Sequence, residues 1–326
     1  AYKIGSTQPM EVAKSIRGQV LNYLKVIQVT AKSEDDAYTI FETLNARGLS
    51  LTSVDLVKNW IFKNYDQTHP NDNAKDIWGN IRKRVSSFSS PEAFFRHYWN
   101  SKYAFASDDR IYKSFKKLLK RGAILPAKEL LLEIDLSSKN YEKIGSPRDN
   151  DWALQKEKSI KRAFELLNQY RVTQPRPFLL ALMDMRDKKL VGQTDFIRMI
   201  ESIERFHFVF SNLCKERASG LEGKYARAAK RLYAAGPSKS NIKTVLTDLT
   251  VYLSNKRPDE KSIKNSLKSI SYSPSGGPEN KIIQTVFSKI ELYLHKTSEL
   301  NIGSLSIEHV RDRSSRATWV DSMENL

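Results

Sequence analysis

Apolar residues recur at the three- and four-residue spacing of an α-helix along most of this 326-residue chain, and the alternating pattern of a β-strand is nearly absent. Glycine and proline, which interrupt helices, number only 13 and 11. These features predict an all-α fold with one large multi-helix domain. No repeat of fixed period is visible, which argues against a helical solenoid.

Capping and turn residues divide the periodic pattern into separate helices. The expected helices cover roughly residues 74–85, 91–99, 110–121, 126–140, 149 or 151 to 170, 178–183 and beyond, 194–210, 222–235, 241–254, 259–269 and 280–297. The segment 178–183 is the most hydrophobic, so we expect it at the centre of the core. Residues 8–30 also show helical spacing, but the alternation in residues 26–30 favours a strand there.

The chain carries 54 basic and 37 acidic side chains, a net charge of +17. This excess indicates a polyanionic partner, with nucleic acid as the first candidate, although a basic protein without such a partner is an open alternative. No run approaches 18 apolar residues and no signal-peptide pattern is present, so no membrane association is expected. A single cysteine, Cys214, excludes an internal disulfide framework and fits a reducing cytoplasm.

Residues 41–60 form the most ordered local pattern in the chain. A helix ends at Asn45-Ala46-Arg47-Gly48, where Gly48 suits a left-handed cap. Thr52 or Ser53 then suits the N-cap of a new helix, with Asp55 in its first turn. Taken alone, the stretch predicts a well-capped helix–loop–helix.

The same stretch resembles the signature of the GmrSD-like family of modification-dependent, type IV-like restriction proteins. The matching positions are Asn45, Arg47, Gly48, Leu51, Asp55, Leu56, Lys58 and Asn59. Residues 95–99, 175–182 and 204–206 are similar to stretches that occur in the same order in that family. The resemblance implies three parts: a remnant of a ParB-like N-terminal domain in residues 1–32, an α-helical domain in 33–298, and the start of a His-Asn-His nuclease module in 299–326.

Residues 305–310 are β-like and contain the pair Glu308-His309. A lone histidine is more often structural or solvated than catalytic. The resemblance implies, however, that the ββα-metal nuclease module begins here, with His309 as the general base and Glu308 as a ligand of Mg²⁺ or Mn²⁺. The family's proline is replaced by Asp312, and the chain stops before the family's asparagine and last metal ligand. We therefore expect the full-length protein to cleave DNA and this chain alone to be inactive.

The family's nucleotide hydrolysis is associated with an Asp-Gly-Gln-Gln-Arg motif in its ParB-like domain, and no such string occurs here. No glycine-rich phosphate loop is present either. We expect the nucleoside triphosphate to bind at an N-terminal domain that this chain lacks, which the signature residues could contact.

Two helices carry clusters of basic residues that are candidates for contacts with DNA phosphates. The candidates are Lys113, Lys116, Lys117 and Lys120 on helix 110–121, and Lys224, Arg227, Lys230 and Arg231 on helix 222–235. Arg227 and Arg231 are four residues apart and share a helix face. Each cluster is also compatible with an ordinary solvated face.

The sequence and the resemblance together favour part of an anti-phage restriction endonuclease in a bacterial or archaeal cytoplasm. Its reaction would be metal-dependent phosphodiester hydrolysis of phage or modified DNA, coupled to a nucleotide-responsive domain. The alternative is a non-enzymatic, basic α-helical module that binds DNA or a partner subunit. A nucleotide-dependent regulator is a third interpretation, and self-association into a homo-oligomer is left open.

Overall fold

Helices account for all the regular structure in the residues that the computed structural model describes, namely 9–25, 30, 52–65, 72–103, 105–273 and 275–295. The prediction of an all-α fold is therefore confirmed for these residues. The expected β-like start of a nuclease module, residues 299–326, lies outside them. The chain divides into two units, Ala1–Leu51 and Thr52–Leu326. The boundary expected near residue 32 falls on residues that are not described.

The first unit contributes one described helix, α1 (Pro9–Tyr23). It begins where the periodicity predicted and ends before residue 30. Residues 26–29, on which the strand prediction rests, lie outside the described residues.

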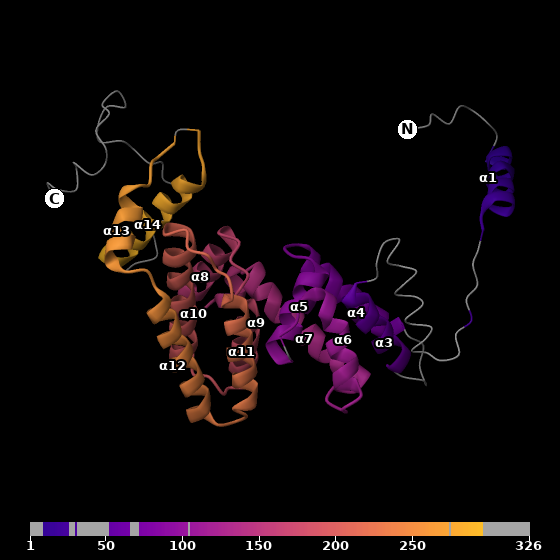
Figure 1. Cartoon of the computed structure of the whole chain (residues 1–326), viewed down its shortest axis with the longest axis horizontal. Coiled ribbons are helices and arrows are strands. Elements are labelled where there is room, and N and C mark those ends of the chain that lie inside the picture. The colour runs from indigo at the N-terminus through magenta and orange to yellow at the C-terminus, as the bar shows by residue number, and fades with distance from the viewer. Residues whose placement is uncertain are drawn as a thin grey trace. The chain divides into compact units, whose positions relative to one another are not determined.

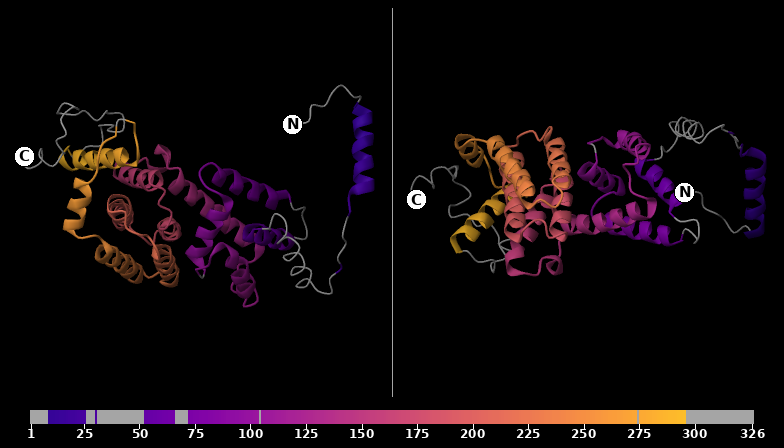
Figure 2. Two further views of the ribbon diagram at one scale, coloured as in Figure 1. Left: turned by 45° about the horizontal axis from the view of Figure 1, so that its top comes forward. Right: turned by 90° about the horizontal axis from the view of Figure 1, so that it is seen from below.

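The second unit consists of twelve described α-helices joined by short connections (Figure 1 and Figure 2). They are α3 (Ser53–Asn64), α4 (Asp72–Ser86), α5 (Pro91–Lys102), α6 (Asp108–Leu119), α7 (Ala127–Gly145), α8 (Lys158–Gln169), α9 (Arg176–Asp187), α10 (Gln193–His207), α11 (Leu221–Ala234), α12 (Lys239–Lys256), α13 (Glu260–Lys268) and α14 (Pro278–His295). Most begin and end within a few residues of the predicted bounds.

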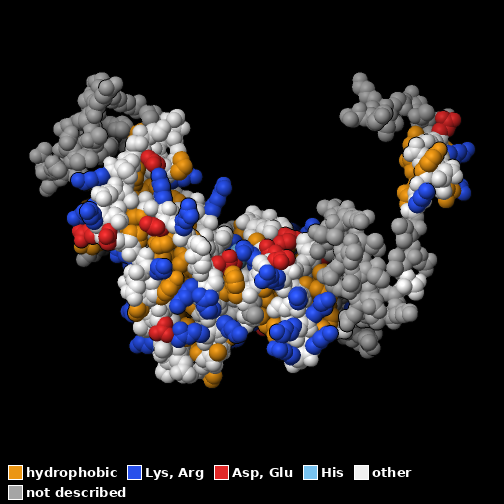
Figure 3. All heavy atoms as spheres, viewed as in Figure 1, with side chains coloured by type: hydrophobic (Ala, Val, Ile, Leu, Met, Phe, Trp, Pro, Cys, Tyr) orange, Lys and Arg blue, Asp and Glu red, His pale blue; other side chains and the backbone are white. Residues whose placement is uncertain are grey.

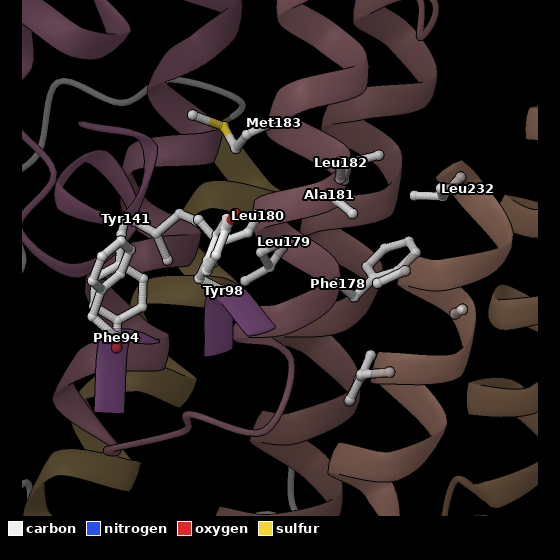
Figure 4. Packing of buried hydrophobic residues seen from close by; sticks show 14 of the residues in the cluster. Phe94, Tyr98, Tyr141, Phe178, Leu179, Leu180, Ala181, Leu182, Met183 and Leu232 are labelled. Carbon is white, nitrogen blue, oxygen red and sulfur yellow. The ribbon is translucent and has the colours of Figure 1, made fainter. Parts of the chain in front are cut away.

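Helix α9 occupies the centre of the core, as the hydrophobicity of residues 178–183 predicted. Every side chain from Phe178 to Met183 is at most 4% exposed. The helix packs against α5 and α7 on one side and against α11 on the other. Figure 4 shows Phe178 on the side toward α11 and Leu232, and Tyr98 and Tyr141 on the opposite side. A helix that is apolar on all sides can be covered only by neighbours around its whole circumference.

The prediction of one continuous helix from residue 149 or 151 to 170 is wrong. The chain instead forms two short 3₁₀ turns, Asp149–Trp152 and Gln155–Glu157, before α8. The break lets the Trp152 ring enter the core, where it lies 5.6 Å from the Phe164 ring and 5.2 Å from the Arg186 guanidinium. Leu154, which was expected on the same apolar face, is 54% exposed. Burial of the indole therefore outweighs the regular helical pattern.

The helix expected over residues 194–210 is α-helical only as far as His207. Helix α10 stops at His207, and residues Phe208–Leu213 form one π-helical turn. Phe208 and Leu213 pack with Ile282 of α14 in a second, smaller hydrophobic cluster. The Lys289 ammonium on α14 pairs with the buried Glu204 carboxylate on α10 at 2.8 Å. Burial raises the pKa of Glu204, against the opposing effect of Lys289.

His207 is fully buried, and its Nε2 lies 3.0 Å from the Tyr225 hydroxyl. Burial lowers its pKa from 6.5 to about 4. Because the unfolded chain binds the proton more tightly, the stability of the second unit should be greatest above pH 6.5 and fall as the pH drops toward 4. The His207 contribution amounts to about 3 kcal/mol. Glu204 acts in the opposite direction, because its pKa is raised.

Denaturant unfolding at pH 7.5 and pH 5, compared between the wild type and His207→Gln, measures this contribution. Glutamine can still bond to the Tyr225 hydroxyl but does not titrate. The loss of stability between the two pH values should shrink in the variant. An unchanged loss would show that His207 is not the group responsible.

Candidate nucleic-acid interface

The two predicted basic clusters lie on α6 and α11, and both helices pack against α5. Both helix predictions are confirmed. Helix α6 buries Ile111 and Phe115 and leaves its lysine-bearing side outward. Helix α11 begins after Gly220, whose φ of +78° is unstrained only for glycine, and buries Tyr225 and Leu232. Figure 3 shows lysine and arginine side chains gathered over the regions of α6 and of α11 and α12 on one face of the second unit.

Arg96 of α5 connects the N-terminal ends of the two basic helices. Its Nη1 lies 3.0 Å from a carboxylate oxygen of Glu222, in the first turn of α11, and its Nε lies 3.5 Å from a carboxylate oxygen of Asp108, the first residue of α6. Glu222 is 126 residues away from Arg96 along the chain. A single guanidinium therefore contacts acidic residues of both helices, which the packing on α5 brings close together.

A buried cluster behind α5 stabilises the same arrangement. The Tyr98 hydroxyl donates a hydrogen bond to Glu133 of α7 at 2.5 Å, and Lys102 pairs with the same carboxylate. The Lys102 ammonium also lies 5.0 Å from the centre of the Tyr233 ring on α11. Burial, with the nearby Tyr103 and then Glu133, raises the pKa of Tyr98 well above its usual value. Tyr98 therefore serves as a neutral hydrogen-bond donor.

The eight predicted DNA-contacting residues differ in how much of their charge is available. Arg231 is paired with Asp248 at 2.6 Å, and the Lys224 ammonium lies 4.3 Å from the centre of the Tyr252 ring. Lys116 lies 5.2 Å from the centre of the Tyr112 ring. Lys120 is exposed and takes part in a further interaction.

Four of the eight are exposed and make no ion pair with any described residue. They are Lys113 and Lys117 on α6, and Arg227 and Lys230 on α11. These four are the best candidates for phosphate contacts, because an ion-paired side chain must give up its partner before it can bind a new anion.

Four of the signature residues are described, and two of them, Asp55 and Lys58, stabilise the start of α3. The Thr52 hydroxyl accepts a hydrogen bond from the Asp55 amide at 3.2 Å, and the Asp55 carboxylate accepts one from the Thr52 amide at 3.3 Å. Lys58 pairs with the same carboxylate at 3.0 Å. Partial burial opposes the effect, but bonds from Lys58 and Thr52 hold the pKa of Asp55 below its usual value. This capping box confirms the predicted N-cap.

The remaining predicted site residues lie outside the described part of the chain. They are Asn45, Arg47, Gly48, Glu308 and His309. Within the described residues, no group of three or more His, Cys, Asp or Glu side chains could hold a metal ion. Cys214 is half-buried beside the second hydrophobic cluster. None of the helices in the described ranges is long and apolar enough to cross a membrane.

Two stretches that resembled the restriction family, residues 95–99 and 175–182, meet in the core. Nδ1 of His97 lies 2.9 Å from the Tyr141 hydroxyl, and Nη1 of Arg176 donates a hydrogen bond to the same hydroxyl at 2.5 Å. Burial and the nearby Arg176 charge lower the pKa of His97 well below its usual value. This network joins α5, α7 and α9. The network is enclosed by the core, so we assign it to packing.

The fold and the site define an all-α protein with two cationic helices held together by one arginine. Residues 3–62 match the family model described as the GmrSD restriction endonuclease, N-terminal domain. The matched stretch contains the 41–60 signature, and it supports a GmrSD-like family of restriction-type proteins for this chain. The resemblance is therefore confirmed over that stretch. A comparison with curated proteins finds no match.

Arg96 and the partners of the basic residues were not identified from the sequence. In the sequence, residues 95–99 show only a loose similarity to the restriction family. Nothing in the sequence indicates that Arg96 binds Asp108 and Glu222, because those contacts depend on how α5, α6 and α11 pack.

Proposed function

We propose that this chain is part of an anti-phage restriction endonuclease, and that its second unit binds the DNA backbone through α6 and α11. The observation that carries the proposal is the set of exposed, unpaired cations on the two helices, Lys113, Lys117, Arg227 and Lys230. Restriction-type proteins act on DNA, and the family match over residues 3–62 supports that class for the chain.

The placement of acidic residues supports this proposal. Asp108 and Glu222, near the helix starts, both contact Arg96, which offsets part of their negative charge. The unpaired cations lie further along each helix, from the second turn onward. This separation leaves positive charge available to the regularly spaced phosphates of a duplex, whose release of counterions favours binding.

The proposal retains the chemistry that the resemblance implies. In the full-length protein, His309 would accept a proton from the attacking water and Glu308 would bind a divalent cation, Mg²⁺ or Mn²⁺, that stabilises charge on the phosphate. A nucleoside triphosphate bound by a ParB-like domain would regulate cleavage. The signature residues Asn45, Arg47 and Gly48 would contact that domain.

Substituting unpaired cations should weaken DNA binding and reduce its salt dependence. For Arg227→Ala with Lys230→Ala, we expect the slope of log affinity against log salt to become shallower by roughly two units for a duplex, since each lost phosphate contact removes about 0.9. The pair Lys113→Ala and Lys117→Ala on α6 should act in the same direction. Fluorescence anisotropy with a labelled duplex measures the slope. The salt concentration should run from about 50 to 200 mM, a range in which phosphate contacts strongly affect affinity.

Two controls distinguish the loss of a direct phosphate contact from a general loss of positive charge. Lys261→Ala with Lys268→Ala removes the same charge from the exposed side of α13 and should leave the slope nearly unchanged. Arg231→Ala should have a smaller effect than Arg227→Ala, because Arg231 is already paired with Asp248. If all these variants reduced the slope equally, binding would depend only on net charge, and the assignment to α6 and α11 would be wrong.

The second candidate is a non-enzymatic module that binds DNA or a partner subunit. The contacts of Arg96 favour this second candidate, because they stabilise a basic surface that could bind DNA without any catalytic residue. It predicts the same salt dependence and differs only in cleavage, which the His309→Ala experiment below measures.

A further inference from the structure

Phe105 is a large aromatic residue that is exposed to solvent and has no role in the proposed phosphate contacts. It lies between α5 and α6, and 54% of its surface is exposed. Its immediate surroundings include the start of α11. A Cβ atom built on Gly223 would lie 4.0 Å from Cε1 of Phe105 and 3.5 Å from Nη1 of Arg227. The phenyl ring and the unpaired guanidinium therefore converge over the same point of α11, where glycine leaves space.

The turn that carries Phe105 is held by buried hydrogen bonds. The Asn100 side chain is fully buried, and its Oδ1 accepts a hydrogen bond from the Ala106 amide at 2.9 Å. Its Nδ2 donates one to the Ala106 carbonyl at 3.2 Å. Both hydrogen bonds hold the backbone of Ala106, so the chain is fixed directly after the exposed ring. An anchor of this kind loses little conformational freedom on binding.

The charges around the ring suit an anionic and aromatic ligand. Two acidic residues at the neighbouring helix starts, Asp108 and Glu222, both contact Arg96. Arg227 makes no ion pair with any residue in the described ranges. A half-exposed aromatic ring beside an available cation matches one nucleotide, because a base can stack on the ring while its phosphate pairs with the guanidinium.

We propose that Phe105 stacks on an unpaired base of the bound DNA and that Arg227 contacts the adjoining phosphate. The inference rests on the proposed DNA-binding function and adds the class of ligand: DNA with at least one base free of its stack, such as a single strand or a looped-out nucleotide. A fully paired duplex buries its base faces and offers Phe105 no such surface.

The test compares three labelled DNAs of one sequence by fluorescence anisotropy: a duplex, the same duplex with one looped-out nucleotide, and the single strand. Phe105→Ala should lose roughly tenfold in affinity for the last two and little for the duplex. Its salt slope should stay unchanged, since no charge is removed. Phe105→Trp keeps an aromatic ring and should bind all three DNAs like the wild type. Phe287→Ala, which removes a 41% exposed phenyl ring from α14, is the matched control and should bind like the wild type.

The outcomes distinguish the inference from the proposed function. If Phe105→Ala bound all three DNAs like the wild type while Arg227→Ala still lowered the salt slope, base stacking would be refuted and backbone binding would stand. An equal loss on all three DNAs would identify Phe105 as a wedge into duplex steps and overturn the unpaired-base assignment. If neither substitution changed binding, the proposed interface itself would be wrong. Unchanged thermal unfolding of Phe105→Ala would show that lost affinity is not lost folding.

Discussion

Replacing His309 with alanine should abolish DNA cleavage by the natural full-length protein and leave its affinity for DNA intact. A general base typically contributes 10²- to 10⁴-fold to a hydrolytic rate, so cleavage by the variant should fall by about that factor. Binding should persist because the proposed contacts lie on α6 and α11. Plasmid nicking in Mg²⁺ or Mn²⁺, with and without a nucleoside triphosphate, measures the first effect, and anisotropy measures the second.

His69→Ala is a suitable control, since this histidine has no place in the predicted nuclease motif. It should cleave like the wild type. Equal cleavage by His309→Ala and wild type would remove His309 from the mechanism. Absence of cleavage by the wild type on every DNA and nucleotide would favour the non-enzymatic binding module.

Replacing Phe178 with alanine should destabilise the second unit more than any surface substitution considered above. The phenyl ring is fully buried on α9, and its centre lies 6.3 Å from that of the Tyr225 ring on α11. Removing a buried phenyl group costs about 3–5 kcal/mol, because the transfer free energy is lost and a cavity remains. The melting temperature should fall by roughly 10 °C.

Phe287→Ala again provides the matched control, because the same group is removed from a partly exposed position on α14. Its cost should stay below about 1 kcal/mol. Differential scanning calorimetry of both variants makes the comparison. Similar losses would contradict the central position of α9.

Much of the fold could be predicted because its determinants are local. The Thr52–Asp55 capping box joins residues three positions apart, and its partners can be recognised in the sequence. The high hydrophobicity of residues 178–183 likewise identified α9 as the centre of the core. Both the backbone hydrogen bonds of a helix and the side chains on one of its faces depend on neighbours within about four residues.

Predictions were wrong where distant packing outweighed the local pattern. Trp152 lies in a sequence compatible with a continuous helix, yet the chain breaks so that its ring can reach Phe164 and Arg186. A residue pattern cannot indicate this outcome, because the gain comes from a pocket formed by other helices. The π-helical turn after His207 was missed for the same reason: Phe208 and Leu213 pack against Ile282, far along the chain.

The candidate site shows the same division between local and distant causes. Composition and helical spacing alone identified a basic all-α chain, the two cationic helices and the residues on them, since charge and periodicity are properties of the chain itself. Which cations are available is different, because ion pairs form between side chains that folding brings together. Arg231 is neutralised by Asp248 on α12, whereas Arg227 makes no ion pair with a described residue, and Arg96 binds Glu222, which lies 126 residues further along the chain. These pairings follow from the packing of α5, α6, α11 and α12, because electrostatic and hydrogen-bond partners depend on distances in space and not on separation along the chain.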